Sequence, residues 1–170
     1  IEIYYMEIIF LGTGTSTGVP SLCCDCEVCL SQDPRNKRLR SSVLVRNKDH
    51  TILVDTSTDL RQQCLLHGIK NIDTVLYTHH HADHVHGIDD LRTLAYKKRQ
   101  KIPVWADLST QKRLNEGFGY IFSTPKNSKY PPICELNLIK KDKIEIDCSQ
   151  EKIEFLPLLV NHGEIDALGF

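Results

Sequence analysis

The feature that most constrains this fold is the stretch "DTVLYTHHHADHVHG", where a short apolar run leads straight into a crowd of histidines. The run "TVLY" carries the β-branched and aromatic residues that are typical of a buried strand. Five of the eight histidines of the chain follow between His79 and His86. The fold must therefore bring the end of an interior strand and these imidazoles to one place, which indicates a functional site.

The spacing His79-x-His81-x-Asp83-His84 predicts a metal site. Side chains alternate along an extended chain, so His79 and His81 project to the same side and can hold one metal ion. Asp83 and His84 come where the chain turns into a helix, and they point to a neighbouring position for a second ion. Neutral imidazoles and a carboxylate suit zinc, and also manganese or iron. A histidine run without a role, or an adventitious nickel site, would lack the interleaved aspartate and the preceding strand.

The two remaining histidines of the run have different expected roles. His80 alternates away from the ligand side, so we expect it to be packed or solvated. His86 is a candidate for the lining of a substrate pocket, and an ordinary surface residue is an equally good interpretation.

A second group of candidate ligands lies in the sequence "CCDCEVC" at residues 23–29. The chain has seven cysteines, an odd number, and no visible secretion signal, which favours a reducing, cytoplasmic location and metal binding over disulfides. Cys24, Cys26 and Cys29 have the spacing of the local half of a knuckle-type zinc site, whose fourth ligand has to come from elsewhere. The other four are expected to be one spare thiol and three core or strand residues, namely Cys23, Cys64, Cys134 and Cys148.

The composition argues against two classes of partner. The 170 residues suit a single domain, and the formal net charge is −1, which gives no case for a nucleic-acid or membrane surface. Only "RTLAYKKRQK" at residues 92–101 is a basic candidate, and a solvated helix face explains it equally well. Apolar runs such as "FLPLLV" are too short to span a bilayer.

Strand and helix patterns together predict an α/β fold in which strand ends carry the site. The expected elements are strands at 7–11 and 102–106, a hairpin of 41–46 and 51–55, helices at 58–68 and 88–100, a short helix at 109–119, and short strands from residue 135 onward.

The glycine-rich turn "GTGTSTGVP" at residues 12–20 has a different expected role from the motif it resembles at first sight. A dinucleotide-binding fingerprint would have another glycine spacing and would open a helix, whereas proline and cysteines follow here. We expect these glycines to let the backbone pass close to the metal site or to a phosphate.

The histidine motif resembles that of the metallo-β-lactamase superfamily, whose signature is H-x-H-x-D-H. The match lies in "THHHADH", preceded by "ILVDTS" and followed much later by "NHG". The resemblance implies an αβ/βα sandwich with a dinuclear site at one edge. It implies further that the first metal ion is bound by His79, His81 and His162, and the second by Asp83 and His84.

Two of the matched residues have rival interpretations. His162 alone could be a capping histidine, although its place at the end of an apolar run favours ligation. Asp55 matches the aspartate that lies beneath the ligand loop in this superfamily, where a buried carboxylate would orient the loop or a ligand imidazole. A simple turn after a strand is the rival for Asp55.

The N-terminal motifs narrow the resemblance. The first strand, the T-G-T-G turn ending in G-V-P, the motif C-x-C-x-x-C and "HADHVHGIDDLR" together resemble the phosphoribosyl cyclic phosphodiesterases of phosphonate degradation. This implies a hydrolase that cleaves a cyclic phosphate or nucleotide-like phosphodiester through a metal-bound hydroxide, with Asp83 assisting proton transfer. The implied cofactors are two divalent ions, zinc or manganese, at the histidine site and one structural zinc at the cysteines, completed by a histidine from the C-terminal part.

The family pattern continues beyond "NHG" with a bridging aspartate and a last histidine. Only seven residues follow Gly163, and Asp166 comes too soon to be the bridge. We therefore expect residues 1–170 to be the N-terminal portion of a single metallo-β-lactamase-like domain, with its sandwich incomplete at the C-terminus.

Other functions stay open on the sequence. The alternative enzymes are a tRNA 3′-processing-like nuclease, a glyoxalase II-like thioesterase and, least favoured, a β-lactamase, which would need export. The alternative outside the enzymes is a non-catalytic metal-binding fragment, whose exposed apolar sheet face would associate as a homo-oligomer. The expected partner is otherwise a small phosphodiester or nucleotide-like substrate, with no membrane and no nucleic acid.

Overall fold

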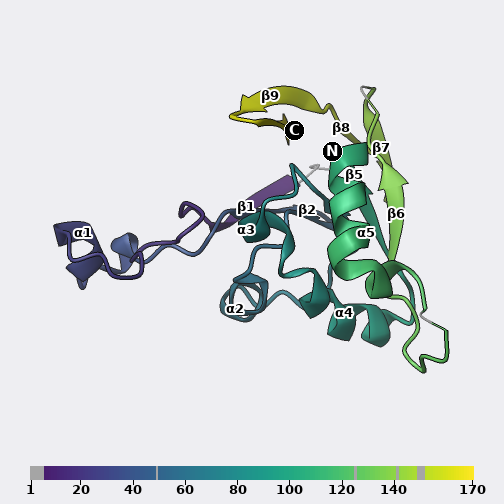
Figure 1. The fold of residues 1–170 in the computed structure, drawn as a ribbon, viewed down its shortest axis with the longest axis horizontal. Helices are drawn as coiled ribbons and strands as arrows, with labels where there is room; N and C mark the ends of the chain where they lie inside the picture. Colours follow the sequence, from purple (N-terminus) through teal and green to yellow (C-terminus); the bar gives the residue numbers. More distant parts are fainter. Residues whose placement is uncertain (1–5, 49, 125, 141, 149–151) are drawn as a thin grey trace, which may run out of the picture.

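The computed structural model describes residues 6–48, 50–124, 126–140, 142–148 and 152–170. A six-stranded sheet in the order β1-β2-β3-β4-β5-β6 forms its centre (Figure 1). Its strands are β1 (Met6–Gly12), β2 (Ser42–Asn47), β3 (His50–Val54), β4 (Thr74–Leu76), β5 (Ile102–Ala106) and β6 (Cys134–Leu138). The first three strands pair antiparallel and β3 to β6 pair parallel, so the predicted hairpin and α/β class are confirmed.

One face of the sheet is covered by helices. Because side chains alternate along each strand, Leu53 and Val75 point into this helical layer. The layer is made of α2 (Leu60–Leu66), α3 (Ala82–Val85), α4 (Leu91–Lys98), α5 (Leu108–Phe122) and a 3-10 turn, Ile88–Asp90. The largest cluster of buried apolar side chains lies between this layer and the sheet, and it fixes the position of β4 at the centre.

The opposite face of the sheet carries a smaller core formed by short hairpins. Ile52 and Leu76 point to this side and pack with residues of β7 (Ile144–Asp147) and β8 (Lys152–Phe155). The last hairpin pairs β9 (Leu158–His162) with β10 (Ile165–Gly169). Its backbone is tied to the histidine loop, because the Leu168 amide donates a hydrogen bond to the Thr78 carbonyl over 2.9 Å.

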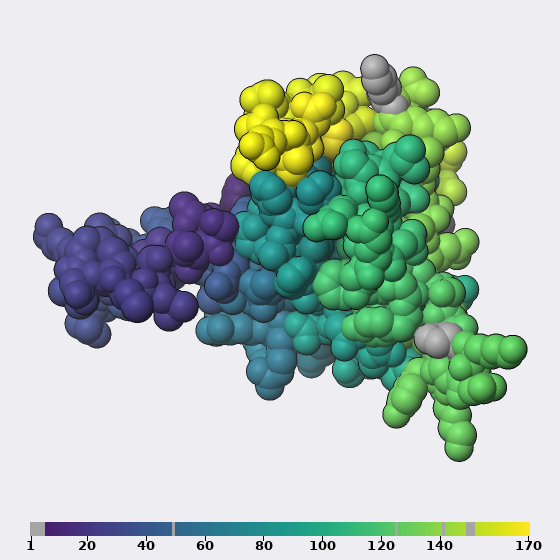
Figure 2. Space-filling view, in the orientation of Figure 1, coloured from purple at the N-terminus to yellow at the C-terminus, as the bar shows by residue number. Residues whose placement is uncertain are grey.

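An arm of residues 13–40 extends from the body of the molecule (Figures 1 and 2). It carries α1 (Glu27–Leu30) and a 3-10 turn, Pro34–Asn36. Backbone hydrogen bonds of 2.7 and 2.8 Å between Val19 and Arg38 hold its two limbs together.

The glycine turn supports this arm, and its expected closeness to the metal site or to a phosphate stays a prediction. A Cβ at Gly12 would lie 2.0 Å from the Arg40 carbonyl oxygen, and one at Gly14 would lie 2.8 Å from that of Arg38. The glycines are therefore needed where the turn packs against the returning limb of the arm.

Two local details differ from the sequence-based expectations. Helix α5 has 15 residues and is not short, with a kink at Phe118. The sequence of α2 predicts an apolar face of Leu60, Cys64 and Leu65, but Leu65 is exposed. The buried polar Gln63 joins Leu60 on the inner face instead, because its side-chain amide donates to the Arg40 carbonyl. Within the described residues no helix is both long and apolar enough to cross a membrane.

Candidate metal centre

Three imidazoles from two distant segments meet at the end of β4. His79 and His81 follow the strand, and His162 comes from the end of β9. One ring nitrogen of each lies within 4.8 Å of the others, and His162 Nε2 is 3.3 Å from His81 Nδ1. The structure thus brings together the three residues that the sequence assigned to the first metal ion.

The triad passes a test of fit to a divalent metal ion on its own chemistry. His79 is only 5% exposed, and its Nε2 is buried without a hydrogen-bond partner. An unsatisfied buried ring nitrogen is costly unless a ligand completes it. Burial, followed by the neighbouring imidazoles of His84 and His81, lowers the pKa of His79 to about 4, so the ring is neutral at pH 7 and able to ligate.

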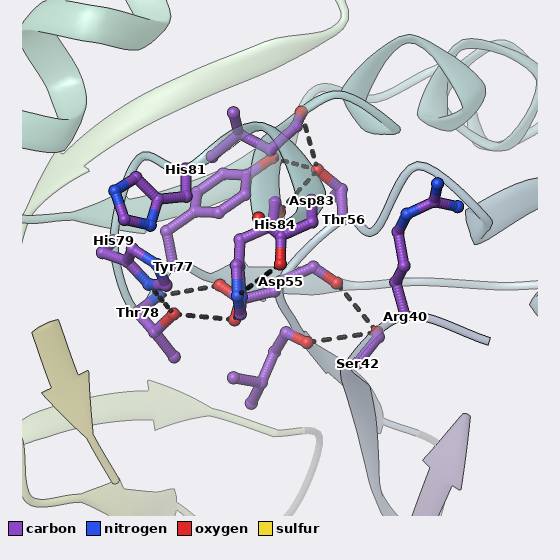
Figure 3. Close-up of polar contacts among 12 residues, drawn as sticks. Arg40, Ser42, Asp55, Thr56, Tyr77, Thr78, His79, His81, Asp83 and His84 are labelled. Atoms are coloured by element: carbon purple, nitrogen blue, oxygen red, sulfur yellow. Dashed lines mark hydrogen bonds and ion pairs between the residues drawn. The ribbon is translucent and has the colours of Figure 1, made fainter. Parts of the chain in front are cut away.

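Asp55 fixes the histidine loop from below (Figure 3). Its buried carboxylate accepts hydrogen bonds from the Thr78 amide (2.8 Å), the Thr78 hydroxyl (2.7 Å) and His84 Nδ1 (2.7 Å). The Thr78 hydroxyl also lies 2.9 Å from His79 Nδ1, which leaves the other nitrogen of that ring to the centre. Asp55 also makes the turn after β3 with a φ of 64°, so it combines both roles considered from the sequence.

Asp83 and His84 lie beside the triad. With Nδ1 bound to Asp55, His84 turns its Nε2 to within 3.2 Å of Asp83 Oδ2, and its ring centroid is 4.1 Å from that of His79. Burial lowers the pKa of His84, but the carboxylates of Asp55 and Asp83 outweigh burial and raise it overall. Among the described residues no third ligand gathers with this pair, so a second metal ion there stays a prediction.

The cysteine cluster lies on the arm around α1 (Figure 1), away from the histidines. The sulfur atoms of Cys24, Cys26 and Cys29 all lie within 4.8 Å of one another. Hydrogen bonds from the Cys29 backbone and the Cys24 thiol lower the pKa of Cys26 to about 7, which favours the thiolate that metals bind. No histidine of the described chain joins this cluster, so the expected fourth ligand is not among these residues.

A hollow of about 520 Å³ opens next to the histidine loop. His80 and His86 both contribute to its lining, and the His86 ring meets that of Phe118 at 5.5 Å between centroids. The sequence reasoning missed Phe118 and Arg113, which also line it. The only local signal was the Gly-Phe-Gly sequence of residues 117–119 inside a helical pattern.

Comparison with known proteins agrees with this fold. Residues 50–170 match the family described as the beta-lactamase superfamily domain, so the chain belongs to this family. A solved structure described as a new diphosphatase from the PhnP family is 38% identical, with a TM-score of 0.83, over 97% of this chain and 61% of that one.

Two curated relatives are also similar in sequence. The octanoyltransferase of Porphyromonas gingivalis is 39% identical over 97% of this chain and 32% of its own length. Coenzyme PQQ synthesis protein B of Methylobacterium nodulans is 34% identical over 51% of this chain and 34% of its own length. The chain thus spans about a third of each of these curated relatives.

Proposed function

We propose that the histidine centre belongs to a metal-dependent phosphodiesterase that acts on a small cyclic phosphate or nucleotide-like substrate. The observation that carries the proposal is the triad itself, in which the buried His79 Nε2 has no partner and faces two further imidazole nitrogens. The similarity to a diphosphatase supports phosphate chemistry over other reactions of a metal centre. We place this activity in the cytoplasm, because clustered cysteines such as those at residues 23–29 suit metal binding in a reducing compartment.

Each residue of the centre has a distinct task in this proposal. His79, His81 and His162 would hold one zinc or manganese ion, and Asp83 with His84 would contribute to a second. Ions bound there would supply an activated water and positive charge for a phosphate under attack. Asp55 holds the His84 ring and the loop backbone in place, and the Asp83 carboxylate is positioned to accept a proton beside the reacting phosphate.

A structural zinc at Cys24, Cys26 and Cys29 is the second part of the proposal. It is supported by the closeness of the three sulfur atoms and by the lowered pKa of Cys26. Its fourth ligand would come from outside the described residues. Such an ion would stiffen the arm and take no part in the reaction.

A thioesterase is the second candidate, favoured by the octanoyltransferase relative, whose substrate carries an acyl group. One assay separates the two. Metal-loaded protein would be tested with bis(p-nitrophenyl) phosphate, a ribose cyclic phosphate and an octanoyl thioester. We expect weak, metal-dependent turnover of the phosphates, abolished by Asp83→Ala and kept by Asp89→Ala, whose carboxylate pairs with Arg92 instead. Turnover of the thioester alone would replace the phosphodiesterase by the thioesterase.

A further inference from the structure

The hollow beside the histidine loop contains groups that the metal centre does not use. It is lined by residues from the loop, from α3 and its C-cap, and from α5. His80, which lines the hollow, lies between His79 and His81 along the loop.

The far rim of the hollow carries one permanent positive charge. Arg113 on α5 is the only arginine or lysine among the lining residues of the described chain, and a guanidinium presents a rigid fork of N–H donors. The Glu116 carboxylate lies 3.1 Å from the Arg113 guanidinium. The side chains of Arg113 and Glu116 are 64% and 49% exposed. Exposed ion pairs of this kind are weak, so an incoming anion can replace the carboxylate.

The wall below this charge is apolar and is formed by a break in α5. Phe118 adopts φ −133° and ψ 26° inside the helix, between two glycines, and its ring packs edge-on against His86. The inner side of Phe118 contacts the main core. A cation at the rim above an aromatic wall suits a ligand that carries a phosphate on an apolar or ring-shaped body.

We infer that this hollow is a substrate subsite in which Arg113 binds a phosphate group other than the one that is cleaved. This inference rests on the proposed function for its substrate. The geometry of guanidinium favours it, because its parallel N–H groups match two phosphate oxygens. Glu116 sets the affinity, since its carboxylate competes with the phosphate for the same guanidinium.

The subsite can be tested without turnover. Inorganic diphosphate would be titrated into the metal-free 170-residue chain, with the dissociation constant from calorimetry and the location from amide shifts of Gly117 and Gly119. Arg113→Ala should weaken binding about tenfold, whereas Glu116→Gln, which frees the guanidinium, should tighten it about twofold. Lys112→Ala is the matched control, because Lys112 is an exposed cation on the same helix outside the lining, and it should leave binding unchanged.

The outcomes separate this inference from the proposed function. Equal effects of Arg113→Ala and Lys112→Ala, no detectable binding, or shifts confined to other regions would each overturn the subsite. Binding that depends on Arg113 in a protein that hydrolyses no phosphodiester would support the subsite and refute the proposed reaction. Phosphodiester turnover together with diphosphate binding that does not depend on Arg113 would support the proposed reaction and refute the subsite.

Discussion

At the scale of single residues, Asp55 links three parts of the metal centre. It ends β3 in a left-handed conformation that aspartate tolerates better than most residues. From there its carboxylate reaches the backbone of the loop, the Thr78 hydroxyl and the His84 ring. A buried acceptor with three donors is costly to replace, because each donor that loses its partner stays buried without a hydrogen bond.

We expect Asp55→Asn to damage the centre more than the fold. The free energy of unfolding should fall by about 2 kcal/mol, because an amide cannot accept all three hydrogen bonds. Affinity for zinc should fall by about 10- to 100-fold, since a ligand imidazole and its loop lose their support. Urea unfolding and competition with a chelator measure the two quantities.

Asp59→Asn is the matched control for this experiment. Asp59 also follows β3 and also accepts from a backbone amide, but that amide and its ion-pair partner belong to Arg40, at the base of the arm. It should lower stability without changing zinc affinity. Equal losses of zinc affinity in the two variants would contradict the assigned role of Asp55.

The neutral ring of His79 predicts a pH dependence of stability in the metal-free protein. Its folded pKa of about 4 lies below the ordinary value of about 6.5, so the unfolded state binds more protons between these values. His79 therefore reduces stability as the pH falls through this window, by about 2 kcal/mol between pH 7 and pH 5. The raised pKa of His84 has the opposite effect on stability. His84 is present in both the parent and the His79 variant, so its effect cancels when the two are compared.

This dependence is measured as the difference between the parent and His79→Gln. Urea unfolding at pH 7 and pH 5 should show a smaller loss of stability in the variant. His67→Gln, which changes an exposed histidine at the end of α2, should behave like the parent. If the parent and His79→Gln lost the same stability between pH 7 and pH 5, burial of the His79 ring would have no energetic effect.

At the scale of elements, the two ligand clusters are positioned differently. The histidine centre depends on the packing of β4 in the sheet and on the β9–β10 hairpin, which places His162. The cysteine cluster depends only on the short segment around α1, on an arm with few contacts to the core. Removing metal from the arm should therefore leave the histidine centre intact.

We predict that Cys26→Ser releases one zinc ion and loosens the arm. Loss of a thiolate removes one of the three described ligands, and structural zinc contributes directly to local folding. Metal analysis should show one ion fewer per chain, and limited proteolysis should cut faster within residues 21–37. Cys64→Ser is the control, because burial raises the pKa of Cys64 to about 11 and it lies in α2. Unchanged zinc content in Cys26→Ser would refute the structural zinc.

At the scale of the whole molecule, the sheet face opposite the helices is only partly covered. Exposed apolar side chains line one face of β1, namely Met6, Ile8 and Phe10, and others lie on β9. A groove beside them is bounded by Phe155 and Phe170. Contiguous apolar surface of this kind favours association with another surface.

We predict that the 170-residue chain self-associates in solution through this face. Sedimentation velocity over a range of concentrations should show dimers or larger species. Phe10→Glu should shift the distribution toward monomer, because Phe10 is 66% exposed and a charge there cannot be buried cheaply. Leu22→Glu, at a 91% exposed position on the arm, should not. A monomer at every concentration would contradict the prediction.

We also predict weak phosphodiester turnover by this chain alone. Only Asp83 and His84 are assigned to a second ion, no group of three ligands among the described residues includes them, and two protein ligands hold a divalent ion poorly against water. The solved PhnP-family diphosphatase, of which this chain spans 61%, provides the comparison at equal metal loading. Turnover of bis(p-nitrophenyl) phosphate that equals the diphosphatase would show that the described ligands suffice.

The sequence by itself determined the parts of the site that lie close together along the chain. The strand that leads into His79, the paired projection of His79 and His81, and the spacing of the three cysteines follow from local geometry, because short segments fix these distances. The spacing also predicted Asp83 and His84, and the family motif added His162 and Asp55, although their mutual contacts were not visible. Local patterns also predicted the strands around the site.

Only the tertiary structure decided what meets across the chain. His162 lies 81 residues from its nearest triad partner and reaches it because β10 hydrogen-bonds to the loop at Thr78. Arg113 and Phe118 meet His80 and His86 at the hollow because α5 packs beside the histidine loop, and the glycine turn packs against the returning limb of the arm. Such contacts depend on how the layers pack, and no periodicity within a segment encodes the distance to another segment.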